Sequence, residues 1–251
     1  MRKHILVTNT IDIYLGDCNE IVPALDRKYD FACCDVQYGI GASNPSKKNK
    51  SIVQKNGNRL PVAQANYPSK EWDNEICNND YFQMLEHHCS RQLIFGGNYY
   101  GLAGGYLVWD KLNSESDQYG CELAWLSFTK RTDVVYCLWS GMMQGSYCGK
   151  DIRKALRQIG NKKLNQSRIH QCEKPIILYD YIYQTYLPEG GTVLDTHGGS
   201  MSNVFSMVKQ GNISAVVIEK DIDHYNDAKK RLLLFEKQAD AFRNTKIIFH
   251  H

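Results

Sequence analysis

The stretch that decides the fold runs from Thr192 to Glu219 and reads TVLDTHGGSMSNVFSMVKQGNISAVVIE. A short apolar run ends at Asp195, and a glycine turn leads into a helical pattern over 202–209 and a second apolar run over 214–218. Strand, crossover helix and strand in this order predict a parallel βαβ unit. Ligands of such units bind outside the carboxyl ends of the strands. We therefore expect a ligand site beside the glycine turn and Glu219.

The same alternation of strands and helices extends to both ends of the chain. Strands are predicted over 11–15, 31–34, 92–95, 106–109, 123–128 and 134–139. Helices are predicted over 20–25 with Asn19 as cap, over 80–89, 175–186 and 222–235, and as a basic helix from Lys150 to Ile159 that Gly160 ends. This order predicts an α/β fold with a doubly wound, mostly parallel sheet, in a single domain over residues 1–251.

The net charge of +3 hides two strongly basic windows. Residues 41–70 contain six basic residues and no acid, and residues 147–170 contain seven basic residues against Asp151, so each window carries +6 and the rest of the chain −9. Two basic arms on an acidic body suit a polyanion, although solvated loops explain the same pattern. The 41–70 window, rich in Ser, Asn, Gly and Pro, is expected to be a long mobile loop. The candidate DNA-binding residues are Lys47, Lys48, Lys50, Lys150, Arg153, Lys154 and Arg157.

Composition argues against several other classes of protein. No apolar run approaches the roughly 18 residues that cross a bilayer, so no membrane association is expected. The nine cysteines are odd in number and form no Cys-x-x-Cys pair, which favours reduced thiols in a cytoplasm, that of a bacterium or a phage-infected host cell. No zinc-ligand spacing occurs, so no metal is expected.

Acids follow four of the predicted strands. These are Asp17, Asp35, Asp195 and Glu219. Glu219 lies one helix and one strand beyond the glycine turn, at the offset of about twenty residues where an acid meets ribose hydroxyls in nucleotide-binding units. The turn lets backbone amides approach a ligand closely. Together they predict a nucleoside-containing cofactor, and the alternative is a set of helix caps beside a tight turn.

Four segments carry a resemblance to a known family. In chain order they are Asp35-Val36-Gln37-Tyr38-Gly39, Ile169-His170-Gln171-Cys172-Glu173-Lys174-Pro175, Asp195-Thr196-His197-Gly198-Gly199-Ser200, and Val217-Ile218-Glu219. They resemble the Asp-Pro-Pro-Tyr-Gly, Ile-His-x-x-x-Lys-Pro, Asp-x-x-x-Gly-Ser-Gly and strand-Glu segments of the DNA amino-methyltransferases, which modify adenine N6 or cytosine N4. The order is the permuted one, with the catalytic motif before the cofactor motif, and the match covers nearly the whole chain.

The resemblance implies a fold of the S-adenosylmethionine-dependent methyltransferase type with S-adenosylmethionine as cofactor. Asp195, Gly199 and Ser200 would lie along the methionine and ribose, with Thr196 and His197 in the same turn. Glu219 would bind the ribose hydroxyls, and Asp17 would reach the adenine amino group. His170 and Lys174 would border the methionine end.

The resemblance also implies site-specific methylation of double-stranded DNA, with adenine N6 as the target. Asp35 and the carbonyl of Val36 would accept the hydrogens of a flipped-out amine, Tyr38 would stack on the base, and Gln37 would complete the turn. Residues 112–168 would form the target-recognition region, and the 41–70 loop would close over the flipped base. The oligomeric state is left open between monomer and homodimer.

Three positions depart from the family pattern. Val36 and Gln37 replace two prolines, each worth about 0.4–1 kcal/mol of unfolded-state entropy. Met201 replaces a glycine, and a positive φ there would cost about 1–2 kcal/mol, which a shift of the turn at Gly198 would offset. The alternatives are therefore a catalytically weakened or inactive homologue that binds DNA or a protein partner, a cytosine-N4 methyltransferase, and a methyltransferase of RNA or a small molecule.

Overall fold

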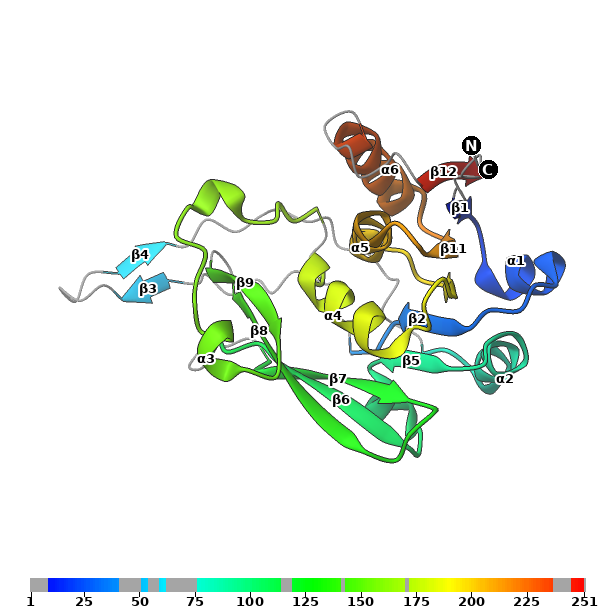
Figure 1. Cartoon of the computed structure of the whole chain (residues 1–251), viewed down its shortest axis with the longest axis horizontal. Helices are drawn as coiled ribbons and strands as arrows, with labels where there is room; N and C mark the ends of the chain where they lie inside the picture. Colours follow the sequence, from blue (N-terminus) through cyan, green and yellow to red (C-terminus); the bar gives the residue numbers. More distant parts are fainter. Residues whose placement is uncertain are drawn as a thin grey trace, which may run out of the picture. The chain divides into compact units, whose positions relative to one another are not determined.

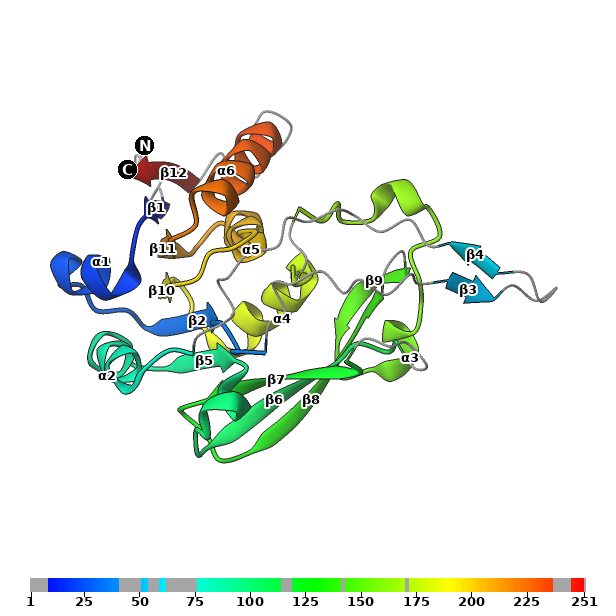
Figure 2. The same cartoon turned by 180° about the vertical axis from the view of Figure 1, so that it is seen from behind.

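The computed structural model describes residues 9–40, 51–53, 59–61, 76–113, 119–140, 143–169, 172–236 and 245–250, with the backbone alone at 51–53 and 59–61. The chain divides into two units, one made of residues 1–36 and 77–251 and the other of residues 37–76. The first unit contains a ten-stranded sheet (Figures 1 and 2).

The order of strands places segments from both ends of the chain side by side. From one edge to the other the strands are β12 (Thr245–His250), β1 (Asn9–Leu15), β11 (Ser214–Glu219), β10 (Thr192–Asp195), β2 (Phe31–Asp35), β5 (Gln92–Phe95), β7 (Cys121–Leu126), β6 (Gly105–Asp110), β8 (Thr132–Ser140) and β9 (Met143–Gly149). Neighbours from β12 to β5 are parallel, as are β6 and β8, whereas β7 runs antiparallel to β5 and β6, and β9 to β8. The predicted mostly parallel α/β sheet is confirmed.

Helices cover both faces of the parallel half of the sheet (Figures 1 and 2). One face carries α1 (Cys18–Leu25) and α2 (Asn79–His88), and the other carries α4 (Ile176–Tyr186), α5 (Ser202–Gln210) and α6 (Ile222–Glu236). The described residues also form short elements of a single turn: α3 (Ile152–Ala155), and the 3₁₀ helices η1 (Gly97–Tyr100) and η2 (Lys162–Leu164).

Successive residues of a strand point to opposite faces of the sheet and pack against the helices on those faces. Val22 on α1 and Leu85 on α2 pack in one core cluster with Ala32 and Cys34 of β2. Phe31 on β2 instead contacts Tyr183 of α4 on the opposite face, at 6.5 Å between ring centroids. A strand buried on both faces requires this continuous apolar sequence, which is why FACC at 31–34 signals a central parallel strand.

Several predicted elements need correction. Asp17, not Asn19, caps α1, because its carboxylate accepts the Asn19 amide hydrogen at 2.9 Å. The basic helix predicted from Lys150 to Ile159 is wrong, since only 152–155 is helical. Beyond it, the Ile159 amide donates to the Gln144 carbonyl at 2.8 Å and the chain runs beside β9.

Two strands at the edges of the sheet, β9 and β12, were not predicted, and the strand predicted over 123–128 lies two residues earlier. The window 41–70, predicted to be a loop, contains β3 (Ser51–Val53) and β4 (Arg59–Pro61), which pair antiparallel within the second unit. The other positions of that window lie outside the described residues.

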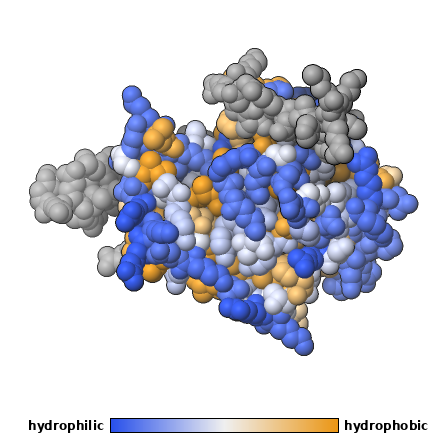
Figure 3. Space-filling model, in the orientation of Figure 1, coloured by the Kyte–Doolittle hydropathy of each residue, from blue (hydrophilic) through white to orange (hydrophobic). Residues whose placement is uncertain are grey.

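The surface and the thiols show ordinary features of a folded domain. All nine cysteines are free thiols, and five of them are buried. Among the helices that the structure describes, none has the length and apolar character needed to cross a membrane. The face drawn in Figure 3 is mainly hydrophilic, with apolar residues scattered among polar ones.

Candidate active site

The topology brings the four strand-end acids to one edge of the sheet. Asp35, Asp195 and Glu219 are the last residues of β2, β10 and β11, and Asp17 follows the end of β1 by two residues. These four strands are neighbours in the sheet and run parallel. Their carboxyl ends therefore lie on the same side of the sheet, along one line across the strands. With neighbouring strands about 4.8 Å apart, the acids form a row about 14 Å long.

The glycine turn after β10 is bound to the neighbouring strand β11. Gly198 donates its amide hydrogen to the carbonyl of Ile218 at 2.8 Å, and a β-carbon on Gly198 would come within 2.9 Å of Val217 Cγ1. Gly199 has a φ of +50° and donates its amide hydrogen to Glu219 Oε2 at 2.6 Å. The two glycines therefore allow a close approach and a left-handed backbone that other residues resist.

Asp195 is almost fully buried and accepts hydrogen bonds from the His197 amide at 3.0 Å and from Asn203 Nδ2 at 2.6 Å. Burial raises the pKa of Asp195 to about 7, and the negative charges of Asp35 and Glu219 also raise it, against the two hydrogen bonds that lower it. Burial likewise raises the pKa of Glu219. Clustered buried carboxylates favour a cation, so this edge suits a positively charged ligand.

The rest of the turn is neutral. Burial lowers the pKa of His197 to about 4, so its imidazole is uncharged at neutral pH. The Thr196 hydroxyl lies 2.7 Å from the Tyr81 hydroxyl of α2 and 2.9 Å from His197 Nδ1. Ser200 is buried, with its hydroxyl 3.0 Å from that of Ser202.

Met201 has a φ of +54°, so the left-handed conformation that a glycine would favour is present with a methionine. Its side chain is fully buried and lies 3.5 Å from where a Gly198 β-carbon would be. Gly198 thus leaves the space that the methionine methyl group occupies. Met201 also precedes α5 without offering a side-chain cap.

Asp35, the predicted catalytic acid, forms an ion pair with Lys174. The Lys174 ammonium also lies 3.3 Å from Glu122 Oε2 and 4.5 Å from the centre of the Phe95 ring. Although burial alone would lower it, the pKa of Lys174 is raised above its usual value by Asp35 and Glu122, so the group stays charged. Lys174 was predicted to border the cofactor, and the structure directs its ammonium to Asp35.

Glu173 is the centre of a second buried network. Its side chain has no exposed surface, and Oε1 accepts from Arg231 at 2.9 Å, from Gln166 Nε2 at 2.5 Å and from Ser202 Oγ at 3.2 Å. Oε2 accepts the amide hydrogen of Ile169 at 2.8 Å. Glu173 therefore ties the segment before α4 to the first residue of α5 and to α6.

The remaining predicted residues are less central. Asp17 caps α1 and pairs with the exposed Lys220 at 2.7 Å, which holds the pKa of Asp17 below its usual value. Val36 is buried, whereas Gln37 and Tyr38 belong to the second unit of the chain. Predicted residues outside the described part of the chain are His170, Lys47, Lys48 and Lys50.

Four basic residues of the second basic window follow the edge strand β9 and are exposed. Arg153, Lys154 and Arg157 all lie on the surface, and Lys150 is exposed with its ammonium 3.2 Å from Asp133. Lys154 lies 3.9 Å from Asp151, whose side chain caps the short helix α3.

Four residues of the site were missed by sequence reasoning. They are Tyr81, Glu122, Glu173 and Asn203. Glu173 and Asn203 lie inside or next to motif segments, so their position gave a signal. Tyr81 and Glu122 reach the site only through long-range packing, which no local pattern shows.

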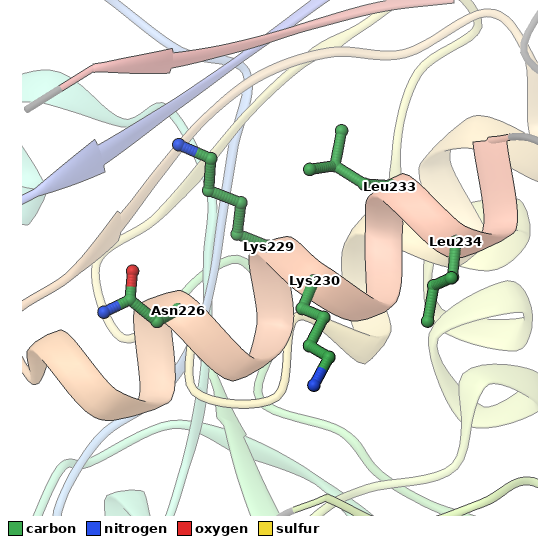
Figure 4. Close-up of a pocket in the computed structure, with 5 residues that line it drawn as sticks. All are labelled: Asn226, Lys229, Lys230, Leu233 and Leu234. Atoms are coloured by element: carbon green, nitrogen blue, oxygen red, sulfur yellow. The ribbon is translucent and has the colours of Figure 1, made fainter.

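A shallow groove also runs along the outer surface of α6. Asn226, Lys229, Lys230, Leu233 and Leu234 line it. In Figure 4, Lys229 and Leu233 extend to one side of the helix and Lys230 and Leu234 to the other. These side chains include no carboxylate, whereas the strand ends gather four, so the strand ends are the better candidate site.

Neither a family model nor a curated protein matches the chain. Solved structures with a similar arrangement include the M1.HpyAVI–SAM complex, with 15% identity, a TM-score of 0.49, and coverage of 88% of this chain and 99% of that chain. TTHA0409 from Thermus thermophilus, complexed with S-adenosyl-L-methionine, has 10% identity, a TM-score of 0.45 and coverage of 96% and 99%. PvuII DNA methyltransferase (cytosine-N4-specific) has 11% identity, a TM-score of 0.46 and coverage of 96% and 95%. At these values the likeness assigns no activity to this chain.

Proposed function

We propose that this chain is an S-adenosylmethionine-dependent DNA methyltransferase that acts on an exocyclic amino group, adenine N6. The observation that carries the proposal is the row of four acids on consecutive parallel strands, beside a glycine turn that is hydrogen-bonded to one of them. The catalytic and cofactor motifs of the sequence fall on these strand ends. The structures crystallised with this cofactor are consistent with the proposal but do not carry it.

The residues at this edge fit the cofactor. Glu219 Oε2 accepts the amide hydrogen of Gly199 at 2.6 Å, and Oε1 accepts that of Asp221 at 2.7 Å. A carboxylate has about four acceptor positions, so Glu219 retains capacity for ribose hydroxyls. The buried Asp195 beside it suits the cationic methionine end. When bound, the cofactor supplies an electrophilic methyl group on a sulfonium sulfur.

The chain's own residues would prepare the amine for attack. The exocyclic nitrogen is a weak nucleophile because its lone pair is delocalised into the base. Asp35 and the carbonyl of Val36 would accept its two hydrogens and align the nitrogen with the methyl carbon, and Tyr38 would stack on the flipped base. The proton lost from nitrogen after methyl transfer would leave through Asp35 or water.

Duplex DNA is the proposed substrate, with residues 112–168 as the recognition region. The exposed Arg153, Lys154 and Arg157 support this assignment, since surface cations bind phosphates and release counterions. The double variant Arg153→Ala/Arg157→Ala should make the negative slope of log affinity against log salt shallower by about 2. Replacement of Lys47, Lys48 and Lys50 by Ala tests the proposed closing loop in the same assay, and unchanged affinity would rule the loop out.

Transfer of labelled methyl groups tests the proposed activity. The protein is incubated with methyl-tritiated cofactor and unmethylated genomic DNA, and the nucleosides are analysed by mass spectrometry. We expect N6-methyladenine, and no product from Asp35→Asn, which keeps the size of the side chain but removes its charge. Detection of N4-methylcytosine would show that cytosine, not adenine, is the target base, and the proposed class of enzyme would stand.

A catalytically inactive homologue that binds DNA is the second candidate, favoured by the left-handed Met201 in the turn. Calorimetry with S-adenosylmethionine separates the two. Micromolar binding is expected only if the cofactor pocket survives, so its absence supports the inactive homologue and contradicts the proposed enzyme.

A further inference from the structure

Lys174 is a buried cation shared between two acids. Its side chain is 3% exposed, against 24% for Asp35 and 21% for Glu122, the two carboxylates that its ammonium contacts. Glu122 accepts a second ammonium, that of Lys111, at 2.5 Å. The four groups therefore form a chain of alternating charge, with Asp35 at one end and Lys111 at the other.

The strand register explains why these residues meet. Asp35 pairs with Phe95 across β2 and β5, and Phe95 pairs with Ala124 across β5 and β7. Residues paired in register face the same side of a sheet, and Glu122 faces that side too because it lies two residues from Ala124. Since β7 runs antiparallel to β5, Glu122 lies beyond the carboxyl end of β5, at the same edge as Asp35.

Glu173, the residue before Lys174, is held by contacts with other elements of the fold. Glu173 is fixed by Arg231 of α6 and by Ser202, the residue that begins α5 directly after the glycine turn. Trp139 on β8 adds a third tie, donating its indole hydrogen to the Glu173 carbonyl at 3.1 Å. One dipeptide thus connects the cofactor turn to the catalytic acid.

The charge pattern suits a carboxylate that must accept hydrogens. A protonated Asp35 would present a donor to the amine, so the site needs the ionised form, which a neighbouring ammonium favours. An ammonium with Asp35 as its single partner would also compete with the amine for the carboxylate. Glu122 weakens this competition, because it also attracts the Lys174 ammonium and so reduces the attraction between Lys174 and Asp35.

We propose that Lys174 is a positioning residue that keeps Asp35 ionised and oriented, and that Glu122 balances its charge. The proposal deepens the proposed methyltransferase function and rests on it for its meaning in catalysis. The effect of Lys174 and Glu122 on the ionisation of Asp35 takes place within the protein itself. It therefore has a test that needs neither cofactor nor DNA.

The test is a ¹³C NMR titration of the Asp35 carboxyl carbon, assigned by its loss in Asp35→Asn. Loss of an adjacent cation raises the pKa of a carboxyl by about 1 to 3 units, so the Asp35 midpoint should move up by that amount in Lys174→Met. Lys174→Arg should restore it. The matched control is Lys111→Met, which removes an equal buried charge that contacts Glu122 instead, and the shift it causes should be smaller.

Glu122→Gln gives a result of opposite sign. Without the second acid, the charge of Lys174 is no longer shared with Glu122, and the midpoint of Asp35 should fall. The proposal is overturned if Lys174→Met moves the midpoint no further than Lys111→Met, or if Glu122→Gln raises it. Should Lys174→Met fail to fold, the Lys174→Gln and Glu122→Gln titrations decide the question by the same signs.

Kinetics distinguish positioning from a merely structural role. We expect the acidic limb of the kcat/KM profile to move to higher pH in Lys174→Met, while calorimetric affinity for S-adenosylmethionine changes less than about threefold. A uniform loss of kcat/KM at every pH would overturn the positioning role. Absence of cofactor binding by the unaltered chain would instead count against the proposed function and leave the NMR result standing.

Discussion

Replacing Met201 by Gly is expected to destabilise the protein even though it relieves backbone strain. The φ of +54° at Met201 costs about 1–2 kcal/mol, which glycine recovers. The side chain is fully buried, and truncating a buried methionine costs about 2–5 kcal/mol. Glycine also adds about 0.4–1 kcal/mol of unfolded-state entropy. Taking the middle of each range, we expect a net loss of about 3 kcal/mol in the free energy of unfolding.

Two further substitutions at this position separate strain from packing. Met201→Leu conserves volume and keeps the strain, so it should cost less than about 1.5 kcal/mol. Met201→Ala loses the packing and keeps the strain, so it should be less stable than Met201→Gly by about 1 kcal/mol. Glycine more stable than alanine reverses the ranking found inside helices and is the order expected for a left-handed residue that precedes a helix.

Urea unfolding followed by circular dichroism measures all four proteins under one condition. The expected order of stability is unaltered chain, then Met201→Leu, Met201→Gly and Met201→Ala. A Met201→Gly protein more stable than the unaltered chain would refute the dominance of packing over strain. A Met201→Ala protein more stable than Met201→Gly would refute the strain itself.

Four further predictions concern the same turn and its supports. Gly198→Ala should lower stability and cofactor affinity, because the added methyl group would lie 2.9 Å from a valine on β11, and urea unfolding and calorimetry measure the two effects. Glu173→Gln removes one partner of a buried ion pair and should cost about 3–5 kcal/mol in urea unfolding. The control, Lys220→Gln, breaks an exposed pair and should cost less than about 1 kcal/mol. Asp195 binds its proton more tightly when folded, with a pKa of about 7, so its contribution to the free energy of unfolding should fall as pH rises from about 4 to 7, and Asp195→Asn should abolish that fall. His197, with a pKa lowered to about 4, contributes the opposite trend between about pH 4 and 6.5, which His197→Gln should remove.

The sequence predicted best the elements whose signals are local. The run from β10 through the glycine turn to β11 was placed within a residue or so, because small apolar strands, a turn and an amphipathic helix each leave a short-range pattern. The bounds of β5, 92–95, agree with those predicted. The glycine at this position in the resembling family raised the question of a positive φ, and Met201 has one.

Long-range pairing explains the failures. The basic segment after β9 has good helix formers, but Gly145 and Gln158 form a β-bridge and only one helical turn remains. Tertiary contacts of this kind override local propensity. The strand β9 itself, MQGSYCG, contains two glycines and few β-formers, and it exists because β8 supplies its hydrogen bonds.

The contact of Lys174 with Asp35 has the same origin and bears on the missing prolines. In the family pattern two prolines restrict the backbone after the catalytic acid. Here Val36 is 2% exposed and packs in the core cluster with α1 and α2, while Lys174 holds the Asp35 side chain from the opposite face of the sheet. The packing of Val36 on one face and the Lys174–Asp35 ion pair on the other restrict the backbone that proline rings would restrict in the family pattern. Under the proposed function, the turn after Asp35 is therefore supported by Lys174 and by the packing of Val36 instead of by the two prolines of the pattern that the sequence resembles.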